Sequence, residues 1–355
     1  RIYRSDALCN YYLGKTAYLR GDYKPAKAYF SKARDLDGLR FRAPEQMNEV
    51  ISRLCAKYPY SHLVDTRAAF ESSSNNGIIG DELMLEHIHP NLHGYALMSD
   101  VFYRSMKQYH LIDVNKENEM EFDRLLRDMP ITTVDSLTGV YTIEKMKRNW
   151  PFGDATARDS FKIESREEQL AHELAFRKTK WAIAMDSLYY FYVNKEDFKK
   201  AKTVMEGMTL EYPEEATFYE KTATLYGKLN DFTNAAFYFK KSFALSPSFQ
   251  GARTLFVIYL KLDKPVEAIP YLDYAIHNNE ANMNLVPVKR FSEEVIRLEK
   301  MVNRDSSDLV ILNQIAEKYF AMGNKEGASK YIEKVLKTDP GNKEALMLLE
   351  HIKGG

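Results

Sequence analysis

A repeat of about 34 residues in the second half of the chain constrains the fold more than any other feature of the sequence. When Asp197-Phe198 is aligned with Asp231-Phe232, the flanking apolar and small residues fall into register, and two further copies follow. Each copy is too short to bury its own apolar face, so the copies must stack on one another. The aligned positions are Leu188, Tyr192, Ala201, Met205 and Pro213; Thr222, Tyr226, Ala235, Phe239 and Pro247; Leu255, Tyr259, Ala268, Leu272 and Ala275; and Leu312, Ile315, Ala316, Tyr319, Ala328, Ile332 and Pro340.

Small residues and prolines in the repeat indicate where helices pack closely and where they end. Alanines such as Ala201 and Ala235 recur near the start of the second helical pattern, where a small side chain lets this helix approach an aromatic residue of the first. Pro213 and Pro247 then end the second helix. The pattern, whose last copy reads GNKEGASKYIEKVLKTDPGN, resembles the tetratricopeptide repeat over roughly 160 residues. This resemblance implies a pair of antiparallel helices in each unit.

The spacing of the copies breaks once. Tyr259 and Tyr319 are 60 residues apart, which is less than two periods, so a degenerate or shortened unit is expected within Ile276 to Ser307. Its Asn-rich start and Pro287 predict an extended stretch before a helix over roughly Ser292 to Val302. After the last copy, Lys343 to Ile352 predicts one more helix, which would cover the open face of the array.

An isolated copy of the same pattern stands at the amino end of the chain. Because a single repeat cannot bury its apolar faces, we expect it to pack on residues that precede this chain or on the domain that follows. The chain begins at Arg1 with no initiator Met and no signal peptide, which suggests a piece of a longer protein. The matching residues are Leu13, Gly14, Ala17, Gly21, Asp22, Tyr23, Ala26, Phe30 and Ala33.

The repeat rhythm stops after Arg42-Ala43-Pro44. Pro44 predicts the start of a helix that runs to about Lys57, and Tyr58-Pro59 ends it. His62 to Asp65 then predicts a short strand. A polar loop from Ser72 to Gly80 leads into the segment GDELMLEHIHPNLHGYALMSDVFYRSM.

This segment resembles the last block of the SGNH, or GDSL-type, hydrolases, in which an acid and a His three residues later precede a proline, a polar residue, a Gly and a helix. The matching residues are Glu86-His87-Ile88-His89-Pro90-Asn91 and Gly94-Tyr95. The resemblance implies that His89 is the general base that activates a serine and that Glu86 orients its imidazole. Such a base must be held within hydrogen-bond reach of the nucleophile while its other ring nitrogen is fixed.

Two departures from the hydrolase pattern follow from the residues. The acid is Glu86 where the family has Asp, so the orienting hydrogen bond is either absent or replaced by one to a backbone carbonyl. No serine block precedes Glu86, which implies that this chain is the carboxyl-terminal part of such a domain and that the nucleophile lies elsewhere. Ser136, in TTVDSLTG, is a poor substitute because it follows the His block and no apolar strand leads into it.

Two histidine-containing segments resemble parts of zinc sites, but neither is complete. His87, His89 and His93 are close enough in sequence for zinc, but alternation along an extended turn points His87 and His89 to opposite sides, and no further ligand is placed to complete a shell. His172-Glu173 begins like a zinc-protease helix, but Phe176 stands where the second His is needed. The sequence therefore predicts no metal and no cofactor.

Composition argues against nucleic-acid binding, membrane spans and a disulfide framework. Fifty basic and fifty acidic residues balance, which gives no reason to expect nucleic acid as a partner. The apolar runs are far shorter than the roughly 20 residues that span a membrane. Cys9 and Cys55 are too few for a disulfide framework. Many of the 24 tyrosines sit at helical spacing, which is typical of repeat core and groove residues.

Taken together, the sequence predicts a mainly α protein: a tetratricopeptide helical-hairpin array plus a partial α/β, SGNH-like segment. The expected domains are 1–43 (isolated unit), 44–110 (hydrolase-like part), 111–177 (connector, with Trp150-Pro151-Phe152 packed on the hydrolase part) and 178–355 (array with a capping helix).

Two functions from different classes remain open. One is the carboxyl-terminal part of an ester hydrolase with His89 and Glu86 at its site; the other is a non-catalytic scaffold that binds a protein on the concave face of the repeats. Clamping of a partner's terminal carboxylate is not expected, because the inner positions hold Asp186, Tyr190, Lys221, Thr224 and Glu317 instead of a Lys and Asn set. The connector also resembles multidomain proteins from Bacteroidetes, which would imply a location in the bacterial cell envelope.

Overall fold

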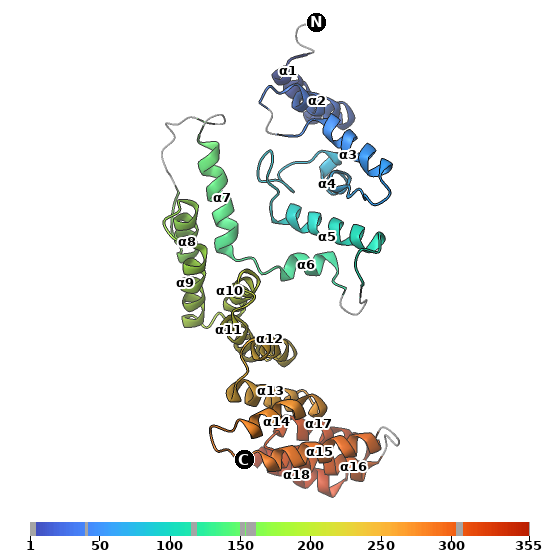
Figure 1. Cartoon of the computed structure of the whole chain (residues 1–355), viewed down its shortest axis with the longest axis vertical. Coiled ribbons are helices and arrows are strands. Elements are labelled where there is room, and N and C mark those ends of the chain that lie inside the picture. Colours follow the sequence, from blue (N-terminus) through green and yellow to red (C-terminus); the bar gives the residue numbers. More distant parts are fainter. Residues whose placement is uncertain are drawn as a thin grey trace. The chain divides into compact units, whose positions relative to one another are not determined.

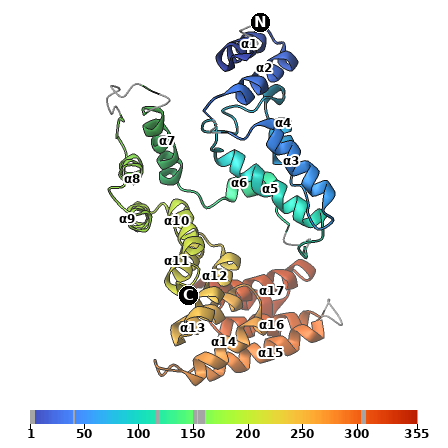
Figure 2. The same cartoon turned by 45° about the horizontal axis from the view of Figure 1, so that its top comes forward.

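The computed structural model describes residues 5–39, 42–114, 119–149, 153, 161–302 and 308–354. By contacts, the chain divides into two compact units: residues up to 129 with 133–178, and 130–132 with 179–355 (Figure 1). Regular structure in the described ranges is helical, as a second view makes plain (Figure 2), apart from a single bridge between Met84 and Pro90. None of the helices in these ranges is both long and apolar enough to cross a membrane.

The first unit contains α1 (Ala7–Leu19), α2 (Tyr23–Leu36), α3 (Glu45–Lys57), α4 (Thr66–Ser73), the 3-10 turn η2 (Asn75–Gly77), α5 (Leu92–Gln108), α6 (Phe122–Asp128), α7 (Thr133–Lys147) and α8 (Arg166–Ala175). The second unit contains α9 (Trp181–Asn194), α10 (Phe198–Glu211), α11 (Ala216–Lys228), α12 (Phe232–Leu245), α13 (Phe249–Lys261), α14 (Pro265–His277), α15 (Val286–Val302), α16 (Leu309–Ala321), α17 (Lys325–Thr338) and α18 (Lys343–Gly354).

The helices expected from the repeat form hairpins of sequence neighbours: α1–α2, α9–α10, α11–α12, α13–α14 and α16–α17. In each hairpin the alanine near the start of the second helix is completely buried: Ala26, Ala201, Ala235, Ala268 and Ala328 all have 0% exposure. Contact between the helices is equally close at Gly14, where an added Cβ would lie 2.7 Å from the ring of Phe30. The paired-helix prediction is therefore confirmed.

The turn inside each hairpin uses one residue in the left-handed backbone region. These residues are Gly21, Glu196, Asn230, Asp263 and Gly323, with φ between 57° and 83°. In three hairpins the residue that follows caps the second helix: the side chains of Asp197, Asp231 and Asn324 each accept a hydrogen bond from the backbone N–H three residues later. A left-handed residue before an N-cap turns the chain back within a few residues.

The irregular stretch between the third and fourth copies holds one long helix. α15 begins at Val286, six residues before the expected start, and Pro287 is inside its first turn. The expectation of an extended stretch through Pro287 is wrong, because a proline in the first turn loses no helical hydrogen bond. α15 contacts both α14 and α16, and α18 covers the last hairpin through Ala345 and Leu348, as expected.

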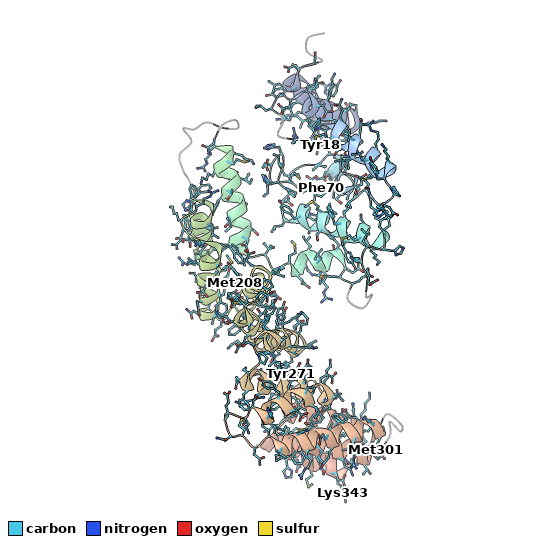
Figure 3. All side chains as sticks on the ribbon, in the orientation of Figure 1. Tyr18, Phe70, Met208, Tyr271, Met301 and Lys343 are labelled. Atoms are coloured by element: carbon cyan, nitrogen blue, oxygen red, sulfur yellow. The ribbon has the colours of Figure 1, made fainter. Side chains whose placement is uncertain are left out.

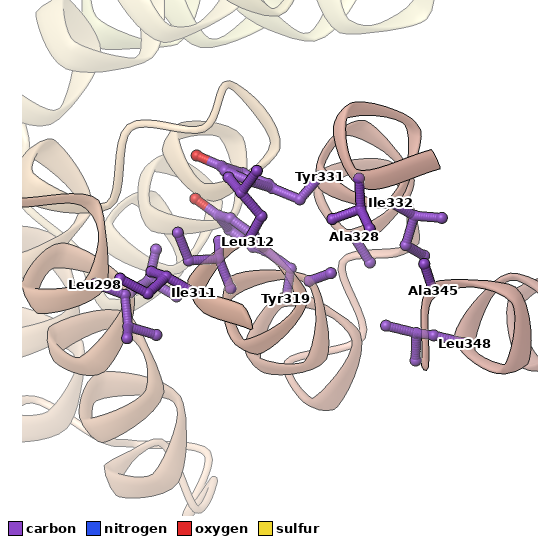
Figure 4. Close-up of a cluster of buried hydrophobic side chains, with 13 residues drawn as sticks. Leu298, Ile311, Leu312, Tyr319, Ala328, Tyr331, Ile332, Ala345 and Leu348 are labelled. Carbon is purple, nitrogen blue, oxygen red and sulfur yellow. The ribbon is translucent and has the colours of Figure 1, made fainter. Parts of the chain in front are cut away.

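A buried polar cluster ties α13–α14 to α16–α17. The carboxylate of Asp263, in the left-handed turn position, accepts hydrogen bonds from the hydroxyls of Tyr319 (2.6 Å) and Tyr331 (3.1 Å) and pairs with Lys330. The two rings stack with their hydroxyls on the same side (Figure 4). Burial raises the pKa of both tyrosines, so both remain donors. The Tyr331 hydroxyl also bonds Glu299 of α15, 3.0 Å away.

The insert differs from its sequence prediction. α3 follows Pro44 as expected, but His62 to Asp65 forms no strand. Asp65 instead caps α4 by accepting a hydrogen bond from the N–H of Ala68, and a strand requires a neighbouring backbone, which the described residues do not supply. The α/β segment expected over 44–110 is therefore absent from the described structure. The insert has only a small core, made of Phe70 of α4 (Figure 3), Leu83 and Leu97.

The expected connector contains a helix pair of its own. α7 and α8 pack together, with the ring of Tyr141 on α7 6.4 Å from that of His172 on α8. Ser165 and Glu168 form a capping box at the start of α8. Trp150, Pro151 and Phe152, expected to pack on the hydrolase part, lie outside the described residues.

The Asp263 cluster yields a stability prediction. Tyr319→Phe removes a buried donor to a carboxylate and should lower the free energy of unfolding of the repeat array by about 2 kcal/mol in urea titrations followed by circular dichroism. Tyr190→Phe, on a half-exposed ring outside the cluster, should change it by less than about 0.5 kcal/mol. Equal effects of the two variants would contradict a stabilising role for the cluster.

Candidate functional site

The Glu86–His89 segment is a closed loop that the first turn of α5 holds in place. The N–H of Leu85 donates to the carbonyl of His89 (2.8 Å), and the N–H of Asn91 donates to the carbonyl of Leu83 (2.9 Å). Asn91 also caps α5 by accepting from the N–H of Gly94, and its amide donates to the carbonyl of Asp81. One asparagine thus joins both ends of the loop to the helix.

Gly94 lets the helix sit directly on this loop. An added Cβ would lie 2.3 Å from the carbonyl oxygen of Leu83 and 2.9 Å from Cβ of Pro90. No side chain fits at such a distance without moving the backbone. Leu83 itself is fully buried, so the loop is anchored at its base.

Glu86 is the centre of the loop. Its side chain is only 4% exposed, and its two oxygens accept hydrogen bonds from the backbone N–H groups of His89 (2.8 Å) and Ile88 (3.0 Å). Burial acts to raise the pKa of Glu86, but these bonds and the contact with the His89 ring outweigh it and hold that pKa below its ordinary value of 4.5. Glu86 is therefore a carboxylate at neutral pH.

His89 lies against this carboxylate. Its Nδ1 contacts Oε1 of Glu86, and about half of the side chain, 52%, is exposed. Fixing Nδ1 leaves Nε2 as the nitrogen through which a base would act. The predicted pair is thus brought together, and the extra methylene of Glu86 does not prevent the contact; the catalytic roles of the two residues stay predictions.

The neighbouring histidines differ from expectation in one respect. Nδ1 of His87 contacts the second oxygen of Glu86, so His87 and His89 approach the same carboxylate and do not point to opposite sides. The tight loop, closed by Leu85 and His89, breaks the alternation of an extended chain. His93 lies on α5, with its ring near Phe122. Over the described ranges, no group of three His, Cys, Asp or Glu side chains is arranged to hold a metal ion.

A cavity of about 560 Å³ adjoins the loop. Glu86, His87 and Ile88 form one wall, and Phe70, Met84 and Met98 give it apolar surface. Neither a serine nor a cysteine is among its described lining residues. Ser136 is in the first turn of α7.

A second candidate surface lies on the first helices of the array. Ile183 and Tyr190 of α9 and Val257 of α13 are 61%, 51% and 41% exposed. Tyr190, Thr224 and Val257 are separated by the repeat period, so they occupy equivalent places on α9, α11 and α13. Lys221 of α11 links two of these helices: its Nζ lies 5.4 Å from the ring centre of Tyr190 and 3.9 Å from Asp186. We call this surface the first-helix face.

Comparison with known proteins identifies the repeats. The tetratricopeptide repeat model matches residues 216–249 and 310–342, which are the hairpins α11–α12 and α16–α17. These matches lie outside residues 44–110. No curated protein matches this chain.

Three solved structures illustrate the range of likeness. YrrB, described as a TPR protein with an unusual peptide-binding site, shares 16% identity over 51% of this chain and 97% of its own, with a TM-score of 0.31. A tetratricopeptide repeat protein from Parabacteroides merdae shares 15% sequence identity over 62% of this chain and 86% of its own, with a TM-score of 0.32. The P58(IPK) TPR domain shares 12% sequence identity over 98% of this chain and 87% of its own, with a TM-score of 0.33.

The state of Glu86 predicts a pH dependence of the loop. Because the pKa of Glu86 is lowered by folding, its stabilisation is complete above the ordinary value of 4.5 and is lost as pH falls through the folded value. The protection factors of the amides of Ile88 and His89 against hydrogen exchange, which correct for the pH dependence of intrinsic exchange, should therefore fall in acid.

Glu86→Gln should remove this dependence and lower the opening free energy at neutral pH by about 1–2 kcal/mol. Glu71→Gln, at a carboxylate that pairs with Lys27 outside the loop, is the matched control. Unchanged exchange in Glu86→Gln would show that the carboxylate does not hold the loop.

Proposed function

We propose that this chain, in which residues 216–249 and 310–342 are tetratricopeptide repeats, is a scaffold that binds a protein partner through the first-helix face of residues 178–355. One observation carries the proposal: exposed side chains recur at equivalent places on α9, α11 and α13, and those on α9 and α13, Tyr190 and Val257, are apolar. In a repeat array such positions lie side by side, so they form one continuous surface that carries these apolar side chains. Surfaces of this kind mark protein-binding sites.

The chemistry of the face supports a protein rather than a small molecule. Tyr190 offers a large ring with a polar tip, a side chain enriched in protein interfaces, and Ile183 adds apolar area beside it. Asp186 and Lys221 supply a charged pair at the same place. Apolar anchors with a polar surround are what a binding hot spot requires.

Substitution on this face tests the proposal. Ile183→Asp with Tyr190→Asp should abolish co-purification of the partner with the full chain, because each change places a charge where an apolar contact is made; a loss of roughly tenfold or more in affinity is expected. The control is Leu210→Asp with Val266→Asp, which makes the same change at exposed residues of second helices. A partner retained by the first variant and lost by the control would place binding on the opposite face.

An ester hydrolase is a second candidate, favoured by the buried Glu86 carboxylate that contacts Nδ1 of His89. In this proposal the helical residues 44–110 close a hydrolase domain whose β-sheet comes from residues outside this range, 1–43 form a separate unit, and 111–177 connect to the array. A serine outside the described site would attack the ester carbonyl, His89 would accept its proton at Nε2, and Glu86 would stabilise the resulting imidazolium.

The hydrolase candidate has its own test. In the longest natural form of the protein, His89→Ala should lower hydrolysis of a short-chain aryl ester by at least about 100-fold, since a positioned base contributes that much. His93→Ala, on an exposed His of α5, should leave the rate unchanged. Hydrolysis that survives His89→Ala would exclude His89 as the base, and the scaffold would then be the one remaining candidate function.

A further inference from the structure

A groove lies beside α13, where the connection before α15 and the turn between α16 and α17 meet. α13 contacts the turn between α16 and α17 directly: the amide of Asn324 donates to the carbonyl of Leu260 (2.8 Å), and Nζ of Lys261 lies 3.6 Å from Glu326. Beside this contact, the connection before α15 contributes Met283 and Leu285. Together these segments enclose a cavity of about 370 Å³.

The floor of the groove is apolar and already packed. Phe256 and Leu285 are buried in the core of the third hairpin, and Met283, Val288 and Met322 pack against it. Methionine side chains adapt to differently shaped apolar groups, which suits a surface that receives a side chain. Val257, at the rim, is 41% exposed and marks the open side.

The rim of the groove is positively charged. Arg253, Lys261 and Lys325 line it, against one acid, Glu326. Lys261 is paired with that acid, whereas Arg253 and Lys325 form no ion pair within the part of the chain that the structure describes. Two uncompensated cations beside an apolar floor attract an occupant that combines negative charge with an apolar side chain.

The wall of the groove is fixed before any ligand arrives. Asn324 bonds Leu260 with its amide and caps α17 with its carbonyl oxygen at Gly327, 3.0 Å away. Asp263, two residues after Lys261, is held by Tyr319 and Tyr331. A preformed groove spares the occupant the cost of ordering it.

We infer that this groove binds an acidic peptide segment, with an apolar side chain on Phe256 and Leu285 and carboxylates at Arg253 and Lys325. The inference rests on the proposed scaffold function and names the chemistry of a partner segment. The groove shares Val257 with the first-helix face but does not include Ile183 or Tyr190, so substitutions at Ile183 and Tyr190 test that face separately from the groove.

Fluorescence anisotropy of labelled peptides with the full chain tests the inference. A peptide of alternating aspartate and leucine should bind, and its lysine–leucine and aspartate–serine counterparts should bind at least roughly tenfold more weakly. Arg253→Glu with Lys325→Glu should weaken binding of the aspartate–leucine peptide roughly tenfold, and added salt should weaken binding to the unmodified chain. Lys240→Glu with Lys337→Glu makes the same change in net charge away from the groove and should leave affinity within about twofold.

A second variant tests the apolar floor without charge. Val257→Trp at the exposed rim should fill the groove and reduce binding while the helical circular dichroism stays unchanged. Aspartate–leucine binding that neither groove variant affects, equal binding of the lysine–leucine peptide, or no peptide binding at all would each overturn the inference. In each of these cases the scaffold function still stands if Ile183→Asp with Tyr190→Asp abolishes partner binding.

Discussion

Each helical hairpin of this protein is held by a close approach of its two helices at a buried alanine. Ala26, Ala201, Ala235, Ala268 and Ala328 all have no exposed surface. Because no larger side chain separates the helices there, the surrounding aromatic and aliphatic residues interlock, and the hairpin becomes one unit. The left-handed turn residues and the caps that follow them make the reversal short enough for that approach. Stacking of such units then supplies the core that none of them has alone.

The departure from this regularity has the most consequences for binding. α15 is a single long helix between two hairpins, and the turn after α16 contacts α13. Asp263 adds a buried polar cluster with Tyr319 and Tyr331 to this contact. A groove with an apolar floor and a basic rim lies beside it.

The loop at Glu86 and His89 obeys a different constraint. Only a small core, of Phe70, Leu83 and Leu97, lies at its base, and hydrogen bonds from Asn91 and to Glu86 give the loop its shape. Gly94 permits α5 to close on it. A carboxylate and an imidazole in this arrangement are what the hydrolase resemblance implies, while the first-helix face of the array favours a scaffold. Both can belong to one protein, since they lie on separate units.

Local patterns in the sequence were enough to determine the hairpins, because the alanines, turn residues and prolines recur at a fixed period and act within one repeat. The sequence also identified Glu86 and His89 as a pair, but it did not predict their direct contact, because Glu86 is one methylene longer than the Asp of the hydrolase pattern. Long-range contacts decided most of the rest. His62 to Asp65 has a strand-like composition, but a strand needs a partner backbone and Asp65 caps a helix instead. The start of α15 was missed for a local reason, because Pro287 falls within the first turn of the helix, where a proline is tolerated. Asp263 reads as an ordinary turn residue in the sequence, and only the tertiary structure brings Tyr319 and Tyr331, more than fifty residues away, to its carboxylate.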